Sequence, residues 1–367
     1  MPRRSCSPTR SPSTAAPATS SSWSARPRVA GDATQDVPWL SPAAANRLLT
    51  CPYSVTYLPT GGRPVLKQTA GRDVGTLAHV ALQRWIETGS WRSAVGDGEL
   101  ARLFSSVAEE RGVDVAKVAD GRMTAARLRR RASELREVLC ELGGEPSAEC
   151  EVTLYDDDRR LWGTVDVLLP SRRGPVVLDL KSGGDAAATA VPDSIAVQLW
   201  MYAALIERCR GARPRWLGVY SLRRGLKQVA LPSDRLTTLL HSLNEVRAGW
   251  LSGDRTAIPT REHCRYCRRR PDCQPHWNAV SQWSDPDGVE GRLVEATTAQ
   301  NGRTAALPAT PTGSAWVSDV STRGMGGWIG RWVRLVRVNP RRDQDGEPDL
   351  SRWRANEQSA VYAVEDR

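Results

Sequence analysis

The sequence predicts a mixed α/β domain with a small β-rich appendage at its C-terminal end, and three observations lead to this prediction. Apolar residues recur at helical spacing before residue 143 and again between residues 194 and 250. Between these segments, short apolar runs alternate with polar turns, which is typical of strands. Beyond about residue 280, Gly, Thr, Pro and Arg interrupt short apolar runs such as "SAWVSDV" and "IGRWVRLVRV". We therefore expect a central mixed sheet flanked by helices.

Helices are expected in five places. Ser41-Pro42 is typical of a helix N-cap followed by proline in the first turn. Apolar residues at helical spacing predict a helix from residue 74 that ends at Gly89, and residues 98–142 form one or two charged helices. The segments "SIAVQLWMYAALIERC" and 234–250 predict two more helices, which flank a further strand pair.

Strands are expected in "CEVTLYD", "RLWGTVDVLLP" and "PVVLDLKS", separated by polar turns at residues 156–160 and 171–174. "RWLGVYSL" and "KQVALP" predict a further hairpin. The apolar run Val176–Leu178 is typical of a strand that is buried on both faces.

Composition divides the chain into three expected regions. Residues 1–36 are mostly Ser, Pro, Thr, Ala and Arg, so we expect a disordered basic tail, with a transit peptide as the alternative. Residues 37–278 form the main domain, and residues 279–367 form the appendage. No apolar run reaches the roughly 20 residues that a membrane span needs.

The net charge of +10 favours an anionic partner, and nucleic acid is the commonest one. Nearly all of this charge is arginine, which weakens the argument because arginine content also follows genomic base composition. Only four lysines occur, at positions 67, 117, 181 and 227. A lysine at a strand end is therefore notable.

Two acidic residues and this lysine stand on neighbouring predicted strands. Asp179 and Lys181 are two residues apart, so they point to the same side of one strand. Asp166 lies on the preceding strand, across a short turn. This pattern is either a surface ion pair or a metal-binding carboxylate pair beside a group that handles water or phosphate.

Two predicted helices carry further polar residues. His79 lies in "GTLAHVALQ", where it is either a buried core histidine or a ligand. Gln198 and Tyr202 share a helix face at i, i+4 spacing, which ordinary packing would also explain.

In this order, the motifs "GTLAH", "GTVD", "DLKSG" and "QLWMY" resemble those of RecB-family nucleases of the PD-(D/E)XK superfamily, over about residues 41–276. The resemblance implies a restriction-endonuclease-like core and hydrolysis of phosphodiester bonds with Mg²⁺ or Mn²⁺. It implies that the ion is held by His79, Asp166, Asp179 and the Leu180 carbonyl, and that Glu151 (or Glu149) supports it. It also implies that Lys181 assists the attacking water, and that Gln198 and Tyr202 contact the nucleic-acid backbone.

Cysteines form a second pattern, Cys264-x₂-Cys267-x₅-Cys273, which is dense enough to indicate a metal or cluster site. By the same resemblance, to AddB-type and CRISPR-adaptation nucleases, Cys51 is the fourth ligand of a [4Fe–4S] cluster. Zn²⁺ is the alternative, with His263 or His276 competing for the fourth position.

We therefore expect a metal-dependent deoxyribonuclease that acts on single strands or ends. No GxxxxGK[ST] loop occurs in the sequence, so a separate helicase, recombination or CRISPR partner would supply any ATP-driven motion. We expect a cytoplasmic, nucleoid-associated protein with no membrane partner. The alternatives are a non-catalytic nucleic-acid-binding or assembly subunit and a zinc-stabilised RNA-binding module.

Overall fold

We describe the fold from a computed structural model of residues 37–60, 62–64, 73–92, 98–118, 120–142, 148–171, 173–181, 191–265, 267–321 and 324–364. The tail expected over residues 1–36 lies outside these described residues. The chain forms two compact units, one of Met1–Asn46 with Tyr57–Ser242 and the other of Arg47–Thr56 with Leu243–Arg367. Helices α1 (Pro42–Thr50) and α6 (Ser233–Leu251) carry the chain from one unit to the other.

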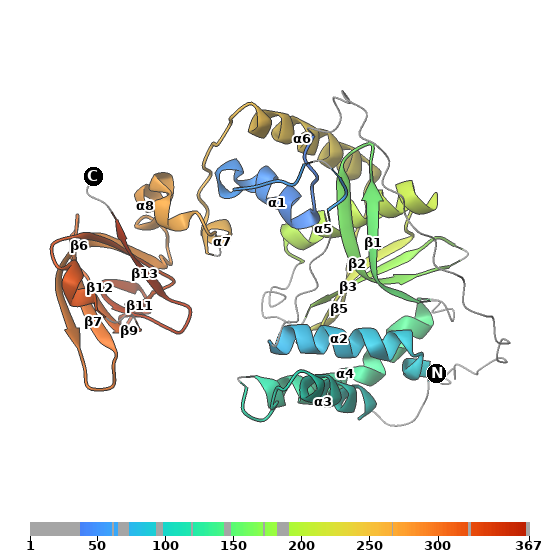
Figure 1. Cartoon of the computed structure of the whole chain (residues 1–367), viewed down its shortest axis with the longest axis horizontal. Helices are drawn as coiled ribbons and strands as arrows, with labels where there is room; N and C mark the ends of the chain where they lie inside the picture. Colours follow the sequence, from blue (N-terminus) through green and yellow to red (C-terminus); the bar gives the residue numbers. More distant parts are fainter. Residues whose placement is uncertain are drawn as a thin grey trace. The chain divides into compact units, whose positions relative to one another are not determined.

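The first unit is built on a five-stranded sheet (Figure 1). Its strands, in spatial order, are β1 (Glu149–Asp156), β2 (Leu161–Leu169), β3 (Val176–Lys181), β4 (Trp216–Ser221) and β5 (Gly225–Val229). Neighbours are antiparallel except β3 and β4, which run parallel. A parallel pair needs a crossover connection, and α5 (Asp193–Arg210) supplies it. The predicted mixed sheet is confirmed.

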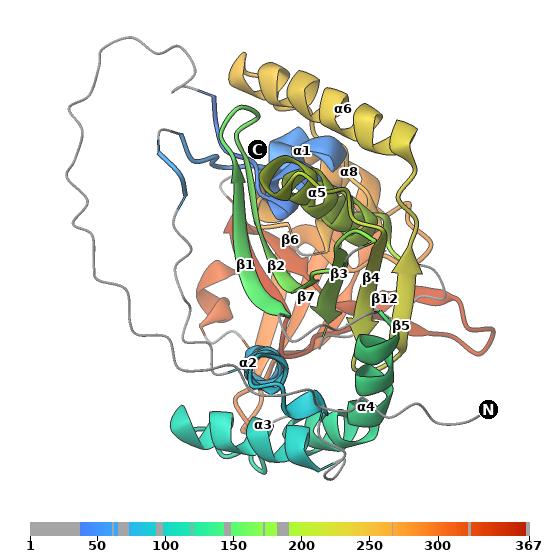
Figure 2. The same ribbon diagram turned by 90° about the vertical axis from the view of Figure 1, so that its right-hand side faces the viewer.

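Helices cover both faces of this sheet (Figure 2). On one face lie α2 (Val74–Glu87), α3 (Glu99–Glu110) and α4 (Gly121–Glu141), and on the other lies α5. Leu178 and Leu180 of β3 belong to the same buried cluster as Leu77, Trp85 and Phe104 of these helices. Because strand side chains alternate, Asp179 and Lys181 face the opposite way, toward α5.

Local signals place α2, which carries His79. Its N-cap Asp73 accepts the Thr76 N–H at 2.9 Å, which satisfies one of the free amides of the first turn. The helix ends just before Gly89, whose φ of 70° requires a residue without a Cβ clash. The predicted helix boundaries are thus confirmed to within two residues.

The second unit holds the cysteine segment and a C-terminal sheet. Helices α7 (Arg261–Cys264) and α8 (Gln274–Val280) precede the strands β6 (Gly288–Thr298), β7 (Thr304–Thr310), β8 (Gly313–Ser314), β9 (Trp316–Val320), β10 (Trp332–Val336), β11 (Asn339–Arg342), β12 (Pro348–Arg354) and β13 (Ala360–Val364). Their order is β11-β12-β9-β7-β6-β10-β13, with β8 paired to β7. The expected β-rich C-terminal region is confirmed.

This sheet has its own apolar core, which includes Leu293, Val317, Val333 and Trp353. Separately, none of the helices in the described ranges is long and apolar enough to cross a membrane.

Candidate active site and cysteine cluster

The first carboxylate lies where β2 and β3 separate. The ladder between these strands begins at the pair Val167–Leu178 and runs away from the site. One residue outside it, Oδ2 of Asp166 accepts the Leu180 N–H at 2.6 Å. The Asp166 side chain therefore takes the place of a backbone hydrogen bond between β2 and β3, and it holds the Leu180 peptide beside the site.

Asp179 and Lys181 meet on the face of β3 that α5 covers. Asp179 is 1% exposed, and its Oδ2 lies 2.8 Å from the Lys181 ammonium in an ion pair. Gln198 of α5 donates to Asp179 Oδ1 at 3.0 Å, and its own Oε1 accepts from Lys181 at 3.3 Å. Gln198 also donates to the hydroxyl of Tyr202 at 2.9 Å, so one amide side chain orients the whole group. Contact of this helix face with nucleic acid stays a prediction.

Three possible metal ligands converge beside this pair from three different elements. One nitrogen of His79 (α2) and one oxygen each of Glu151 (β1) and Asp166 (β2) all lie within 4.8 Å of one another. The His79 ring also hydrogen-bonds the backbone of Leu180, which brings that peptide into the same place. Asp179 lies outside this group of three. The structure thus groups Glu151, to which the sequence assigned a supporting role, with two of the predicted ligands.

Glu151 reaches this position through an unusual backbone conformation. Its φ of 50° lies in the left-handed region, although it is in the middle of a strand. The pairs Cys150–Val167 and Val152–Val165 flank it, so Glu151 stands directly opposite Asp166. Such a conformation costs about 1–3 kcal/mol and is found most often at functional sites. The alternative acid, Glu149, forms an ion pair with Arg210 at 2.8 Å.

The electrostatics of this group favour a bound cation. Burial raises the pKa of Asp166 to about 6, and burial together with the charge of Asp166 raises the pKa of Asp179 to about 6. Burial raises the pKa of Glu151 as well, with a contribution from Glu87. Burial and the Lys181 charge lower the pKa of His79, which keeps the imidazole neutral and able to act as a ligand. These residues fit a divalent ion, because it would compensate their excess negative charge.

Two further residues shape the site. A Cβ at Gly163 would lie 2.9 Å from the ring of Tyr202, so the glycine of "GTVD" makes room for the tyrosine behind the carboxylates. Glu87 lies two helical turns after His79 and acts on the pKa of Glu151. Sequence reasoning missed Glu87, although the i, i+8 spacing from His79 places both residues on one helix face.

The four predicted cluster cysteines come together in the second unit. The thiols of Cys51, Cys264 and Cys273 are buried and that of Cys267 is half-buried. Burial raises the pKa of the Cys264 thiol to about 11 and raises that of Cys267 and Cys273. In each of the three cases the charge of neighbouring members of the four contributes to this rise. The cysteines therefore form one electrostatic group that needs a positive partner to be ionised.

Backbone amides point at all four sulfur atoms. The Ile258 N–H donates to Cys51 Sγ at 3.4 Å. Backbone hydrogen bonds lower the pKa of the other three thiols, with Thr260 acting on Cys264, Arg269 and Arg270 on Cys267, and His276 on Cys273. Such bonds stabilise thiolates, the form that binds a metal or cluster.

The sulfur atoms are more widely spaced than the ligands of the active site. Within the described ranges, no three of the four Sγ atoms lie within 4.8 Å of one another. The three ligand atoms of the active-site group do lie within that distance. Each of the two alternative ligands has one ring nitrogen in a hydrogen bond, and Nδ1 of His276 is buried without a hydrogen-bond partner among the described residues. His263 Nδ1 lies 3.0 Å from the Thr260 hydroxyl, and His276 Nε2 accepts from Arg270 at 2.9 Å.

A sequence model of the PD-(D/E)XK nuclease superfamily matches residues 39–274. The chain belongs to this superfamily. Membership implies a metal-dependent nuclease, and the mixed sheet with helices on both faces agrees with the restriction-endonuclease-like core of such nucleases.

Two solved structures share limited similarity with this PD-(D/E)XK nuclease. The crystal structure of SSO0001 is 18% identical, covers 55% of this chain and 84% of its own, and has a TM-score of 0.26. The crystal structure of the tetrameric p202 HIN2 is 18% identical and covers 24% of this chain, with a TM-score of 0.18. The match spans 48% of that second structure. No curated protein matches the chain by sequence.

Proposed function

We propose that this chain is a divalent-metal-dependent deoxyribonuclease of the RecB type that cleaves single strands or ends. The observation that carries the proposal is the meeting of His79, Glu151 and Asp166 within 4.8 Å, from a helix and two strands. It lies beside the buried ion pair of Asp179 and Lys181. Carboxylates and a neutral imidazole held on rigid elements are a ligand set for Mg²⁺ or Mn²⁺.

His79, Glu151 and Asp166 would hold the ion, with Asp179 and the backbone of Leu180 next to it. A bound Mg²⁺ or Mn²⁺ supplies charge neutralisation at the phosphate and lowers the pKa of a water. The imidazole ligand favours Mn²⁺ alongside Mg²⁺.

The chain's own residues orient the attacking water and the phosphate. The Lys181 ammonium is fixed between the Asp179 carboxylate at 2.8 Å and the Gln198 amide at 3.3 Å. This cation is in place before substrate arrives, so it stabilises developing negative charge without reorganisation. Burial raises the pKa of the Tyr202 hydroxyl, so Tyr202 stays neutral and holds Gln198 in position.

The substrate proposed is DNA, because the net charge of +10 favours a polyanion. The sequence has no phosphate-binding GxxxxGK[ST] loop, so we place the nuclease with a separate helicase, recombination or CRISPR-adaptation partner. We place it in the cytoplasm, at the nucleoid.

We also propose a [4Fe–4S] cluster on Cys51, Cys264, Cys267 and Cys273. The support is the meeting of the four thiols in one electrostatic group, in which the charges of Cys51, Cys267 and Cys273 act on the pKa values of their neighbours. The cluster's role is structural, since it joins residues 47–56 to the 264–273 segment within the second unit. The brown colour and visible absorption of anaerobically purified protein test it, and stoichiometric zinc in place of iron would contradict it.

Cleavage of end-labelled single-stranded DNA tests the enzyme. Wild-type protein is assayed with Mn²⁺, Mg²⁺ or EDTA beside Lys181→Ala, and Lys117→Ala serves as a control of equal charge change. Lys117 is surface-exposed and paired with Asp114 at 3.1 Å. We expect metal-dependent cleavage that falls by about 10²–10³ in Lys181→Ala only. Equal cleavage by both variants would indicate a contaminant. Tight DNA binding without cleavage would favour a non-catalytic binding subunit.

A further inference from the structure

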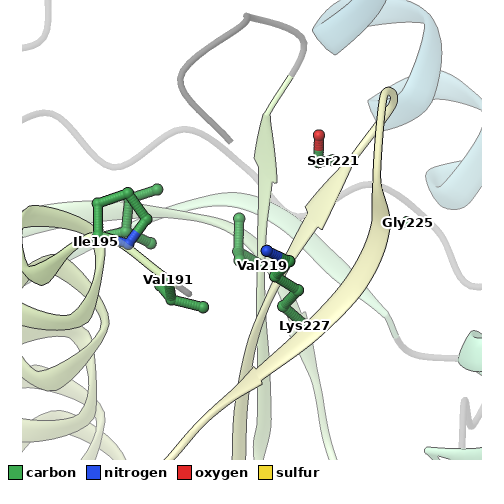
Figure 3. Close-up of a pocket in the computed structure, with 7 residues that line it drawn as sticks. Val191, Ile195, Val219, Ser221, Gly225 and Lys227 are labelled. Atoms are coloured by element: carbon green, nitrogen blue, oxygen red, sulfur yellow. The ribbon is translucent and has the colours of Figure 1, made fainter. Parts of the chain in front are cut away.

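Two neighbouring arginines occupy the turn between β4 and β5. The turn has the sequence "SLRRG", and the side chains of Arg223 and Arg224 are both exposed. Ser221 and Gly225, which are labelled in Figure 3, pair with each other at the base of this turn. Among the described residues, neither guanidinium forms a hydrogen bond or an ion pair. Two positive charges therefore face solvent without compensation.

This turn leaves the sheet at the same end as the active site. Strands β3 and β4 run parallel, and their last pair is Lys181 with Ser221. The Leu222 N–H then donates to the Lys181 carbonyl oxygen at 3.0 Å. Because neighbouring strands lie about 4.8 Å apart, the turn begins one strand away from the backbone of an active-site residue.

The backbone of the turn is held by buried and paired groups. Ser221 is 2% exposed, and its hydroxyl oxygen accepts the Arg223 N–H at 3.3 Å. Gly225 closes the turn with a φ of 79°, in the left-handed region that favours glycine. From α4, the Arg131 guanidinium donates to the Arg223 carbonyl at 3.1 Å, and an ion pair with Glu134 fixes Arg131. A ligand of the two exposed arginines would therefore not have to order the backbone that carries them.

Helix α4 extends the positive surface beside the turn (Figure 2). A Cβ at Gly225 would meet the side chains of Arg131 and Glu134, so the turn packs on this side of α4. Arg127 lies four residues before Arg131, and Arg130 lies four residues before Glu134, so both stand one helical turn away on the same side. Arg127 is half-buried and Arg130 is exposed. In the part of the chain that the structure describes, neither guanidinium has a hydrogen bond or an ion pair.

These four residues form a basic cluster, defined as Arg127, Arg130, Arg223 and Arg224. Guanidinium groups bind phosphate oxygens in a bidentate manner, so the cluster is complementary to a row of phosphates. Within the active site, the Lys181 ammonium is already paired with Asp179 at 2.8 Å. A polyanionic strand that enters this site therefore gains attraction from cations outside it.

We propose that the basic cluster binds backbone phosphates of the DNA strand next to the phosphate that is cleaved. Arg223 and Arg224 contact the phosphates nearer the active site, and Arg127 and Arg130 continue the contact along α4. All four are substrate-positioning residues, and their contacts are independent of sequence because they read phosphates and not bases. This inference rests on the proposed nuclease function and deepens it, since it names the surface that holds the uncleaved part of the strand.

Binding of a single-stranded oligothymidylate, with Ca²⁺ in place of Mg²⁺, tests the basic cluster. The double variant Arg223→Ala/Arg224→Ala removes both charges of the turn. Each phosphate contact on a single strand contributes about 0.7 to the slope of log K against log salt, so the slope should fall by about 1.4. If the two proteins bind equally at about 1 M salt, the variant binds about 25-fold more weakly at about 0.1 M salt. Arg223→Lys/Arg224→Lys keeps both charges and should recover most of the affinity.

The matched control is Arg122→Ala/Arg129→Ala, which removes two exposed arginines from the same helix. At about 100° per residue, Arg122 and Arg129 lie about 160–180° around α4 from Arg131, on the side away from the turn. Affinity and salt slope should therefore match the wild type. Mn²⁺ affinity should be equal in all of these proteins, because none of the substituted residues lies in the metal site.

A scan with neutral linkages locates the contact on the strand. A methylphosphonate replaces one phosphate of the oligonucleotide at a time. At linkages beside the cleavage position it should weaken binding to the wild type and leave binding to Arg223→Ala/Arg224→Ala unchanged. Equal sensitivity of both proteins at every linkage would overturn the proposed contact.

The outcomes separate this inference from the function on which it rests. Equal affinity and salt slope for the wild type and Arg223→Ala/Arg224→Ala would overturn the DNA contact even if the wild type cleaves DNA, and would leave an acidic partner protein for these arginines. An equal loss in Arg122→Ala/Arg129→Ala would overturn it too, since binding would then follow net charge alone. Absence of cleavage with any metal, together with the expected loss of affinity in the turn variant, would refute the nuclease and leave the basic cluster as a DNA-binding surface.

Discussion

The closely spaced carboxylates of the active site should make the metal-free protein less stable than a variant that lacks one of their charges. Burial raises the pKa of Asp166 from 3.8 to about 6. Between these values the folded protein keeps a proton that the unfolded chain has released. Stability therefore falls as pH rises through this window, and the loss is complete above it. The difference corresponds to about 3 kcal/mol.

Asp166→Asn removes this charge and keeps an oxygen for the Leu180 N–H, which Asp166 accepts at 2.6 Å. We expect the variant to be inactive and, in EDTA near neutral pH, more stable by up to about 3 kcal/mol. Thermal unfolding measures this, since 1 kcal/mol corresponds to about 2–4 °C for a unit of this size. The gain should shrink toward about pH 5, where the wild-type carboxyl is itself protonated. Added Mn²⁺ should stabilise wild type and leave the variant unchanged.

Asp156→Asn is the matched control. Asp156 is another carboxylate of the first unit, and it is 2% exposed, but the Arg159 guanidinium lies 2.8 Å from it. Removing its charge breaks an ion pair and should destabilise the protein. If Asp166→Asn lowers the melting temperature in EDTA as Asp156→Asn does, the argument from uncompensated charge is refuted.

Four further experiments probe the active site and other parts of the molecule. Mn²⁺ affinity, measured by calorimetry, should rise from about pH 5 to 7 as the two active-site aspartates release their protons, and a flat profile would contradict their raised pKa values. Cys264→Ser should lose visible absorption and lower the urea midpoint of the second unit; unchanged absorption would exclude this ligand. Gly163→Ala, whose Cβ would lie 2.9 Å from Tyr202, should reduce cleavage without abolishing Mn²⁺ binding, and full activity would show that the ring can shift freely. Arg270→Met removes a 2% exposed guanidinium that binds Asp287 at 2.7 Å. Denaturant titration should show that this variant is destabilised by about 3–5 kcal/mol. A stability unchanged within error would contradict a role for this buried pair.

The order and type of the elements followed from the sequence, because each depends on neighbours along the chain. The apolar spacing and the Asp73 cap determine α2, and the period of two places Asp179 and Lys181 on one side of β3. The cysteine pattern likewise predicts a second site, which stays a prediction. These are local properties, because they depend on residues that are close together along the chain.

Distances between elements were decided only by the tertiary structure. The φ of 50° at Glu151 brings its carboxylate to His79 and Asp166, while Asp179 turns toward Lys181 and Gln198 instead. No spacing in the sequence indicates that Glu151, rather than Asp179, joins His79 and Asp166. The division of the chain into two units also depends on segments far apart in the sequence. A sequence specifies which way a side chain points from its own strand, but the gap between two strands is set by register and packing, which are collective properties of the fold.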